Sequence, residues 1–308
     1  MSLPDENSPC HVIGAPTPYA VLEPLLLPEP GRPPEVCRRA PECRRPAEGD
    51  LRLLRQAAMG IPPGLLRAPD RPGDRARYRW ILGHHAAIAL WQRLRATLEA
   101  AARAPEPAED LIGAAARLYD VYSVLFLYAG SCTAERYAAT VRAEMTDRHP
   151  AFSGEWARDY EAIPGLVRRV LERHPRELTA PLAEAARLNH RVHMAVAEKL
   201  VPGGVSLLQE HGRRPGEGPT EEERDLYDAY FVVRRRPVCE PAYDAQLVRR
   251  LTQVLCDLAA HGLSEDRRMR VVRVVADRAV PLLRGLAEDV AAGERCPGSR
   301  LHPASSAT

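Results

Sequence analysis

The stretch RARYRWILGHHAAIALWQRLRATLEAAAR, residues 75–103, predicts a long helix. Its Ala, Leu, Arg and Glu residues all have high helix propensity. The helix follows Asp74 and ends before Pro105, because proline removes a backbone donor and disfavours helical geometry in the preceding residue. Comparable stretches recur along the chain and predict further helices over 108–129, 132–148, 155–174, 179–201, 220–235, 241–261 and 264–291.

Hydroxyl side chains are candidate caps at the starts of three of these helices. Ser131 and Thr179 are placed to accept hydrogen bonds from the first turn, and Thr220 with Glu223 has the spacing of a capping box. No segment alternates convincingly between apolar and polar residues. We therefore predict an all-α fold, a helix bundle.

Proline content divides the chain into three parts. Residues 1–73 are rich in Pro and Arg, with the run Pro-Glu-Pro-Gly-Arg-Pro-Pro at 28–34, and predict an extended or partly disordered N-terminal arm. Residues 74–292 predict a helical domain, which contains the candidate site residues discussed below. Residues 293–308 predict a flexible tail.

Charge and hydropathy exclude several classes of protein. The chain carries 43 basic and 41 acidic residues, a net charge of +2, which argues against a dedicated nucleic-acid-binding protein. No apolar run reaches the ~18 residues of a membrane span. The first residues also lack the basic and apolar regions of a secretory signal. We expect a cytoplasmic protein that binds neither nucleic acid nor membrane.

The seven cysteines are scattered, and no CxxC pair occurs. An odd number without metal-ligand spacing argues against both a disulfide framework and a structural zinc knuckle. This usage is typical of a reducing compartment such as the cytoplasm.

Helix-borne histidines are the strongest candidates for chemistry. The chain has no P-loop, no GxGxxG after a strand, no GxSxG, no HExxH and no cysteine-ligated haem signature. Two segments remain, one with His84 and His85 and one with His190 and His193. Histidine is a good metal ligand and also titrates near neutral pH.

A helical wheel of residues 179–201 separates the second pair of histidines. His193 falls near the centre of an apolar stripe and His190 at its border. A buried imidazole needs a partner. A hydrogen bond to a carbonyl satisfies that need as well as a metal does, so the residues alone leave both interpretations open.

Both histidine segments resemble tryptophan 2,3-dioxygenase, a helical haem enzyme. In that family a Leu-Trp pair follows the distal histidine, with the Trp six residues after it, and His85 and Trp91 have this spacing. The family's proximal ligand lies in an Arg–aromatic–Asn–His element that precedes a Met-containing helix and a Gly-rich loop. Here 187–190, Met194 and 202–204 follow that order. The resemblance implies a similar helix bundle.

A smaller branch of the same superfamily is more similar, over roughly residues 75–290. It comprises the histidine-ligated, haem-dependent L-tyrosine hydroxylases of antibiotic pathways. The similar segments are LYDVYSVLFLYAG at 118–130, NHRVHM at 189–194 and SLLQEHG at 206–212. The loop at 201–206 lacks the Thr that the dioxygenase places over tryptophan, which disfavours tryptophan as the substrate.

The resemblance to these hydroxylases implies haem b and a reaction. L-tyrosine would be hydroxylated at ring C3 to 3,4-dihydroxyphenylalanine with hydrogen peroxide, on a route to the alkylproline unit of antibiotics. The Asn-His element favours His190 as the axial iron ligand and the apolar stripe favours His193. We take His193 as the ligand and His190 as the runner-up. His85, on the opposite haem face, would be the catalytic acid–base.

Substrate-binding residues follow from the same resemblance. Arg136 matches the position of the dioxygenase's carboxylate-binding arginine with a one-residue difference in spacing, although a pair with Glu135 is an equally good interpretation. Trp91, Tyr128 and Tyr122 are candidates to line the pocket, but aromatic residues at helical spacing are also ordinary core residues. The relatives are homo-oligomers, which implies a dimer.

Three alternatives remain. One is a tryptophan- or indole-dioxygenase-like haem enzyme. A second is a non-haem bundle that binds Zn²⁺ or Fe²⁺ through the histidines, although no inward carboxylate accompanies them. A third is a non-catalytic helical scaffold with Arg-rich faces.

Overall fold

Helices dominate the structure, as the all-α prediction requires. The computed structural model describes residues 8–293 except 11–12, 38–39, 106, 213–217 and 264–269. The long helices are α1 (Ala40–Ala58), α2 (Pro72–Arg103), α3 (Glu109–Ala129), α6 (Ile163–Arg173), α7 (Arg176–Leu200), α10 (Glu240–His261) and α12 (Ala279–Ala291). The predicted tail lies almost entirely outside the described residues.

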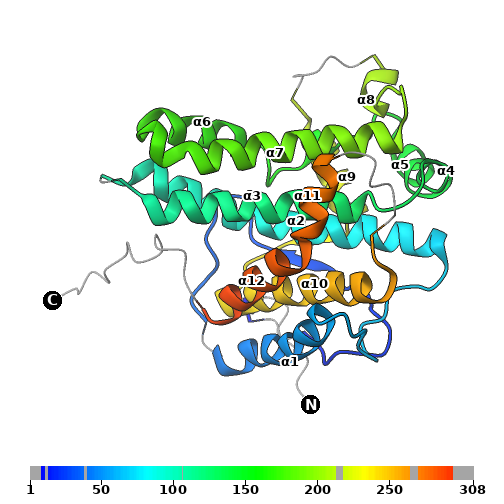
Figure 1. The fold of residues 1–308 in the computed structure, drawn as a ribbon, viewed down its shortest axis with the longest axis horizontal. Helices are drawn as coiled ribbons and strands as arrows, with labels where there is room; N and C mark the ends of the chain where they lie inside the picture. Colours follow the sequence, from blue (N-terminus) through cyan, green and yellow to red (C-terminus); the bar gives the residue numbers. More distant parts are fainter. Residues whose placement is uncertain are drawn as a thin grey trace.

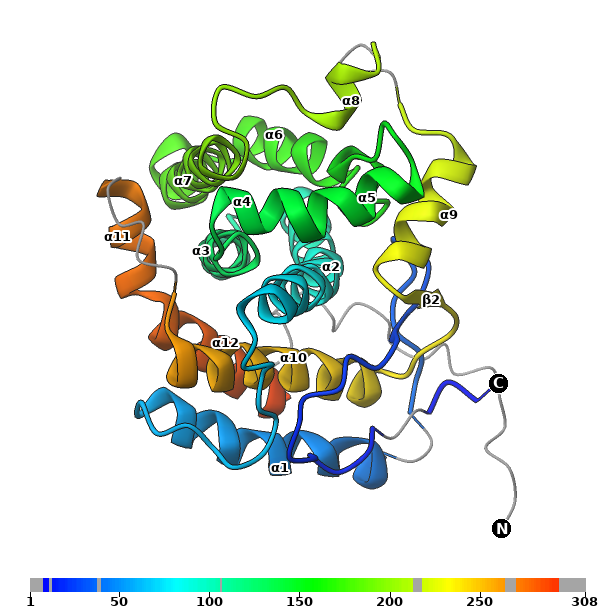
Figure 2. The same ribbon diagram turned by 90° about the vertical axis from the view of Figure 1, so that its right-hand side faces the viewer.

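The long helices stack in layers (Figure 1). α1 lies at the base beneath α10 and α12, α2 and α3 form the middle, and α6 and α7 form the top. α11 (Arg270–Asp277) crosses the edge of the layers from α12 towards α7. The view turned by 90° shows α3 with α2 on one side and α7 on the other (Figure 2). α3 is thus the central helix of the upper half.

The short elements line the connections between these helices. α4 (Ala134–Tyr137), a π turn (Ala138–Arg142) and α5 (Ala143–Arg148) follow α3. A 3₁₀ turn (Gly154–Trp156) precedes α6, and α8 (Leu207–Glu210) and α9 (Glu221–Tyr230) follow α7. The two strands, β1 (Leu25–Leu27) and β2 (Val233–Arg235), pair in parallel.

Several helix boundaries differ from the predicted ones. Thr133, and not Ser131, caps the helix after α3. α7 begins at Arg176, so Thr179 lies inside it and bonds back to the Pro175 carbonyl. Thr220 does form the predicted capping box with Glu223. That helix ends at Tyr230, and the chain next forms β2. β2 is a strand because it pairs with β1, which is distant in sequence.

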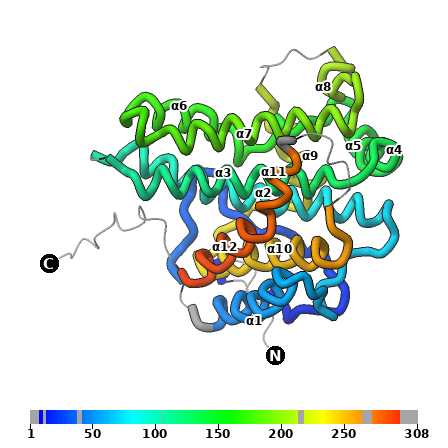
Figure 3. Tube along the Cα trace, viewed as in Figure 1, coloured from blue at the N-terminus to red at the C-terminus, as the bar shows by residue number. Residues whose placement is uncertain are grey.

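The N-terminal segment is more ordered than the predicted arm. It contains α1, and β1 is fully buried. The side-chain amide of Gln246 on α10 accepts from the Leu26 amide at 2.8 Å and donates to the Leu26 carbonyl at 3.0 Å. The tube trace shows this segment, in blue, running alongside α10 and α1 (Figure 3). Contacts with α10 therefore hold a proline-rich chain that has little helix propensity before residue 40.

α3 combines length and apolarity with deep burial. By length and composition alone it could cross a membrane, but 78% of its most apolar window is buried inside the fold. Its hydropathy is therefore that of a core helix with neighbours on both sides.

Two glycines let the helices next to α3 approach closely. A Cβ at Gly83 of α2 would lie 2.8 Å from the Ala129 Cβ, and one at Gly130 would lie 2.4 Å from a methyl group of Val196 on α7. Both contacts fall at the C-terminal end of α3. The segment with His84 and His85 directly follows Gly83, and the segment with His190 and His193 precedes Val196. The two histidine segments therefore lie on either side of that end of α3.

We expect Gly83→Ala to lower the free energy of unfolding by about 1–3 kcal/mol, since α2 and α3 must separate to admit the methyl group. Gly113→Ala, within α3, is the matched control because the nearest atom to its added Cβ is the end of Arg117, 3.6 Å away. That control gains about 0.5–1 kcal/mol from helix propensity. Urea unfolding of both variants measures the difference, and the same sign in both would contradict the close packing.

Candidate active site

His85 is fully buried on α2 and held by one hydrogen bond. Its Nε2 lies 2.5 Å from the carbonyl oxygen of Phe231, which can only accept, so Nε2 carries the proton. Nδ1 is buried and has no hydrogen-bond partner among the described residues. The structure thus contains a buried imidazole with a fixed tautomer and an unpaired acceptor nitrogen.

His84 packs against the ring of Phe231, whereas His85 bonds to the carbonyl of the same residue. Its Nδ1 donates to the Trp80 carbonyl at 2.7 Å, and its ring stacks on that of Phe231 with centroids 4.2 Å apart. Trp80 also lies edge-on to Tyr137. These contacts are those of a structural core residue.

Burial makes His85 a source of pH dependence. Burial, and then the nearby Arg250 charge, lower the pKa of His85 from 6.5 to about 3. Between about pH 6.5 and 3, the unfolded chain therefore binds a proton at His85 that the folded chain does not bind. The stability that depends on neutral His85 is complete above about pH 6.5 and is lost as the pH falls towards 3.

We expect this group to remove about 2 kcal/mol of stability between pH 6.5 and 5, at about 1.4 kcal/mol per pH unit. His85→Gln keeps a donor for the Phe231 carbonyl and removes the titration, so its unfolding free energy should vary less with pH by that amount. Urea unfolding at a series of pH values measures both slopes. Identical slopes would show that His85 is protonated in the folded protein.

The two histidines of α7 are at the surface, which corrects the helical wheel. The buried face of α7 contains Leu182, Ala185, Asn189 and Val192, whereas His190 and His193 are exposed. The wheel placed the centre of the buried face at His193, one residue after the buried Val192. It was wrong because the packing of α7 against α3 determines which face is buried. Asn189 donates to the Ser123 hydroxyl of α3 at 3.2 Å. Neither histidine forms a hydrogen bond within the described part of the chain.

A continuous row of aromatic rings joins His193 to the interior. The His193 ring stacks on Phe126 with centroids 4.6 Å apart, and Phe126 contacts Tyr122 at 4.6 Å. Tyr122 meets Trp91 edge-on at 5.3 Å. Trp91 also contacts Tyr160 at 5.2 Å. The structure therefore brings together three of the predicted site residues, Trp91, Tyr122 and His193, from three helices.

Tyr128 belongs to a different buried group. Its hydroxyl donates to Asp257 at 2.9 Å, and Asp257 also accepts from Arg79 at 2.6 and 3.1 Å. Arg79 donates further to the carbonyl of Gly262 and to Ser131. Burial and the Asp257 charge hold the pKa of Tyr128 well above its usual range. This network ties α2 and α3 to α10.

Arg136 lies on the outside of α4. Its side chain is exposed and forms no ion pair with any described residue, so the suggested pair with Glu135 is absent. The structure does not bring it into contact with His85, Trp91 or Tyr128.

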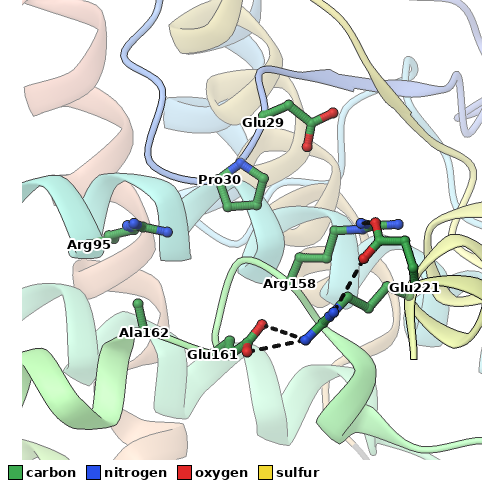
Figure 4. Close-up of a pocket in the computed structure, with 8 residues that line it drawn as sticks. Glu29, Pro30, Arg95, Arg158, Glu161, Ala162 and Glu221 are labelled. Carbon is green, nitrogen blue, oxygen red and sulfur yellow. Dashed lines mark hydrogen bonds and ion pairs between the residues drawn. The ribbon is translucent and has the colours of Figure 1, made fainter. Parts of the chain in front are cut away.

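A cavity of about 470 Å³ is lined mainly by charged side chains (Figure 4). Arg95 on its wall is one helical turn from Trp91, and Glu161 directly follows Tyr160. Arg224 bonds to Glu161 and to Glu221 at 3.2 Å. The lining residues are Glu29, Pro30, Arg95, Arg158, Glu161, Ala162, Glu221 and Arg224.

The cations and anions of this cavity are balanced. Arg158 pairs with Glu221 and Asp225, and Arg95 pairs with Glu99 at 2.8 Å. Such a surface offers both guanidinium and carboxylate groups. It suits a zwitterion, whose carboxylate and ammonium could exchange with these ion pairs.

Comparison with known families adds a finding about the first half of the chain. Residues 36–187 match the SfmD 3-methyl-L-tyrosine peroxygenase family. No curated protein is significantly similar to the chain.

The match to the SfmD family covers just under half of the chain. It includes α1 to α6 and the first half of α7, and so contains His85, Trp91, Tyr128 and Arg136. It ends at residue 187, before His190 and His193. The match supports a peroxygenase, an oxidoreductase that uses peroxide, and an aromatic amino acid as the substrate.

The α7 histidines fit a haem ligand better than His85 does. An axial ligand needs a ring nitrogen that the iron can reach. His193 and His190 are exposed and make no hydrogen bond to a described residue, whereas the two nitrogens of His85 are enclosed. His193 also lies against the apolar ring of Phe126, which partly desolvates it and lowers its pKa, favouring the neutral form that binds metals.

Sequence reasoning missed the charged cavity. Its arginines and glutamates come from the N-terminal segment, α2, the chain before α6, and α9, and no motif connects them. The one local signal is the i, i+3 pair Glu221 and Arg224 in the first turn of α9. Such pairs are common on exposed helices.

Proposed function

We propose that this protein is a histidine-ligated haem peroxygenase that hydroxylates the ring of a tyrosine-type amino acid. The observation that carries the proposal is the match of residues 36–187 to the SfmD peroxygenase family. The specific reaction is the conversion of L-tyrosine and hydrogen peroxide to 3,4-dihydroxyphenylalanine and water. We place this reaction in the biosynthesis of an alkylproline unit of an antibiotic. A cytoplasmic homodimer is part of the same proposal.

His193 would hold the haem iron, with His190 as the alternative ligand. When bound, the haem supplies the oxidising chemistry that transfers one oxygen atom from peroxide to ring C3. The exposure of both rings and the stacking of His193 on Phe126 support this assignment. The row of rings from His193 to Trp91 supplies an apolar, aromatic wall for a substrate ring.

His85 is the residue that we propose to move a proton. The carbonyl of Phe231 fixes Nε2–H, which leaves Nδ1 as the atom of the ring that can accept a proton. Nδ1 would take a proton from the near oxygen of hydrogen peroxide and return it to the far one. Because His85 is fully buried, this role requires that the Nδ1 side of the ring open when haem and substrate bind.

The charged end of the substrate has two candidate partners, Arg136 and the charged cavity. Two variants separate them. If the cavity binds the amino acid, Arg224→Gln raises the KM for L-tyrosine by on the order of 10-fold or more, the effect of losing one charged hydrogen bond of about 1.5–3 kcal/mol. Arg136→Gln then leaves KM unchanged. The reverse pattern would assign the carboxylate to Arg136, and steady-state kinetics of both variants decides.

Product analysis tests the reaction itself. The haem-loaded protein is incubated with hydrogen peroxide and, separately, L-tyrosine, 3-methyl-L-tyrosine and L-tryptophan, and products are analysed by mass spectrometry. We expect the tyrosines to gain one oxygen atom, and L-tyrosine to give 3,4-dihydroxyphenylalanine. A tryptophan product with two added oxygens would favour the dioxygenase alternative. Reactions without peroxide or without haem are the controls.

A further inference from the structure

Four cysteines from three segments of the chain lie together at the start of α10. They are Cys10, Cys37, Cys43 and Cys239, and their sulfur atoms all lie within 4.8 Å of one another. Cys43 and Cys239 are buried, and Cys10 and Cys37 are partly buried. The cluster is independent of the histidines and of the aromatic row.

The spacing of the sulfurs fits a single tetrahedral ion. Zinc–thiolate bonds of about 2.3 Å place the sulfurs of a tetrahedron about 3.8 Å apart. The Cys10 and Cys37 sulfurs are 3.7 Å apart. A disulfide requires about 2.05 Å. The measured separation is therefore close to the edge of a metal tetrahedron and much longer than a sulfur–sulfur bond.

The backbone around the cluster is tied together independently of any metal. The Cys239 amide donates to the Pro9 carbonyl at 2.9 Å, which sets Cys10 beside the start of α10. Glu35 forms a parallel bridge with Cys239, which brings Cys37 to the same place. Cys43 lies in the first turn of α1, which packs along α10. Three separate chain segments are thus fixed with their thiols converging.

We infer that Cys10, Cys37, Cys43 and Cys239 bind one structural zinc ion. Four protein thiolates close the coordination sphere and leave no position for a substrate, which is the pattern of structural and not catalytic zinc. The ion would join the N-terminal segment to α1 and α10. It would hold in place a proline-rich chain in which β1 is the one strand or helix among the described residues before α1.

The surroundings of the cluster favour thiolates, the form of cysteine that binds a metal ion. Four neutral thiols gain little from being buried together, whereas a bound divalent cation deprotonates them outright. Cys239 is the N-cap residue of α10, whose positive end favours a thiolate. Arg236 donates to the Ser8 carbonyl at 2.7 Å and adds positive charge beside the site.

Elemental analysis of the full-length protein, purified without chelators, tests the inference. We expect one zinc per chain, independent of haem content because haem contributes only iron. Cys37→Ser, at a partly exposed position, should lower the zinc content at least tenfold. Cys132→Ser is the matched control, since Cys132 is a buried cysteine outside the cluster, and it should retain zinc.

A titration of the zinc-depleted wild-type protein with Co²⁺ makes the test independent of whether a variant folds. Tetrahedral thiolate coordination gives intense visible absorption that saturates at one Co²⁺ per chain and disappears when Zn²⁺ is added. Absence of both zinc and this absorption would overturn the inference. So would disulfides among these four cysteines in non-reducing peptide mapping, or non-haem iron in place of zinc.

Discussion

Asp257→Ala lowers the free energy of unfolding by about 3–5 kcal/mol, the cost of leaving a buried charge without its partner. Asp257 is fully buried and accepts from Arg79 and from the Tyr128 hydroxyl. Without Asp257, the charged Arg79 guanidinium remains buried between α2 and α10 without its ion-pair partner. The remaining acceptors, the Ser131 and Gly262 carbonyls, carry no full charge to balance it.

The control for Asp257 is an ion pair at the surface. Glu288→Ala breaks the Arg55–Glu288 contact of 3.0 Å, in which the Arg55 side chain is 55% exposed. Water screens that pair, so the expected loss is about 0–1 kcal/mol. Urea unfolding of both variants gives the comparison. A loss of less than about 1 kcal/mol for Asp257→Ala would show that the Arg79 network does not stabilise the layers.

His193→Ala should abolish haem retention and hydroxylation together. Loss of groups that merely orient a ligand costs about 10–100-fold in metal affinity. Loss of the ligand itself should therefore lower haem content and turnover by on the order of 100-fold or more. His190→Ala should keep both. The Soret absorbance per chain after gel filtration measures haem, and mass spectrometry measures product.

The two histidine variants are matched because both residues are exposed on α7, three residues apart. Added imidazole should restore part of the Soret band in His193→Ala, since a free ligand can occupy the vacated position. Haem loss in His190→Ala alone would assign the iron to His190. Full haem retention in both variants would contradict an axial ligand on α7.

The positions of the long helices could be predicted from local chemistry. α2, α3 and α10 coincide with their predicted ranges within about three residues, because helix propensity and flanking prolines act over short distances. β2 was missed since its strand geometry depends on β1, which is about 200 residues away in the chain.

The candidate site was predictable only in part, for the same reason. The wheel correctly gave α7 an apolar face but centred it on His193, because it could not include the contact of Asn189 with α3. The cysteines show the limit most clearly. Rules based on CxxC spacing detect ligands that are close in sequence, and Cys239 is far from Cys10, Cys37 and Cys43.

Oxygen labelling tests the central claim, that this protein is a haem peroxygenase, most directly. The protein is expressed with a haem precursor, its Soret band is recorded, and L-tyrosine is then added with ¹⁸O-labelled hydrogen peroxide. We predict a Soret band and a 3,4-dihydroxyphenylalanine product whose new oxygen is ¹⁸O. A protein that stays colourless with haem, or a product that acquires its oxygen from unlabelled water or dioxygen, would contradict the account.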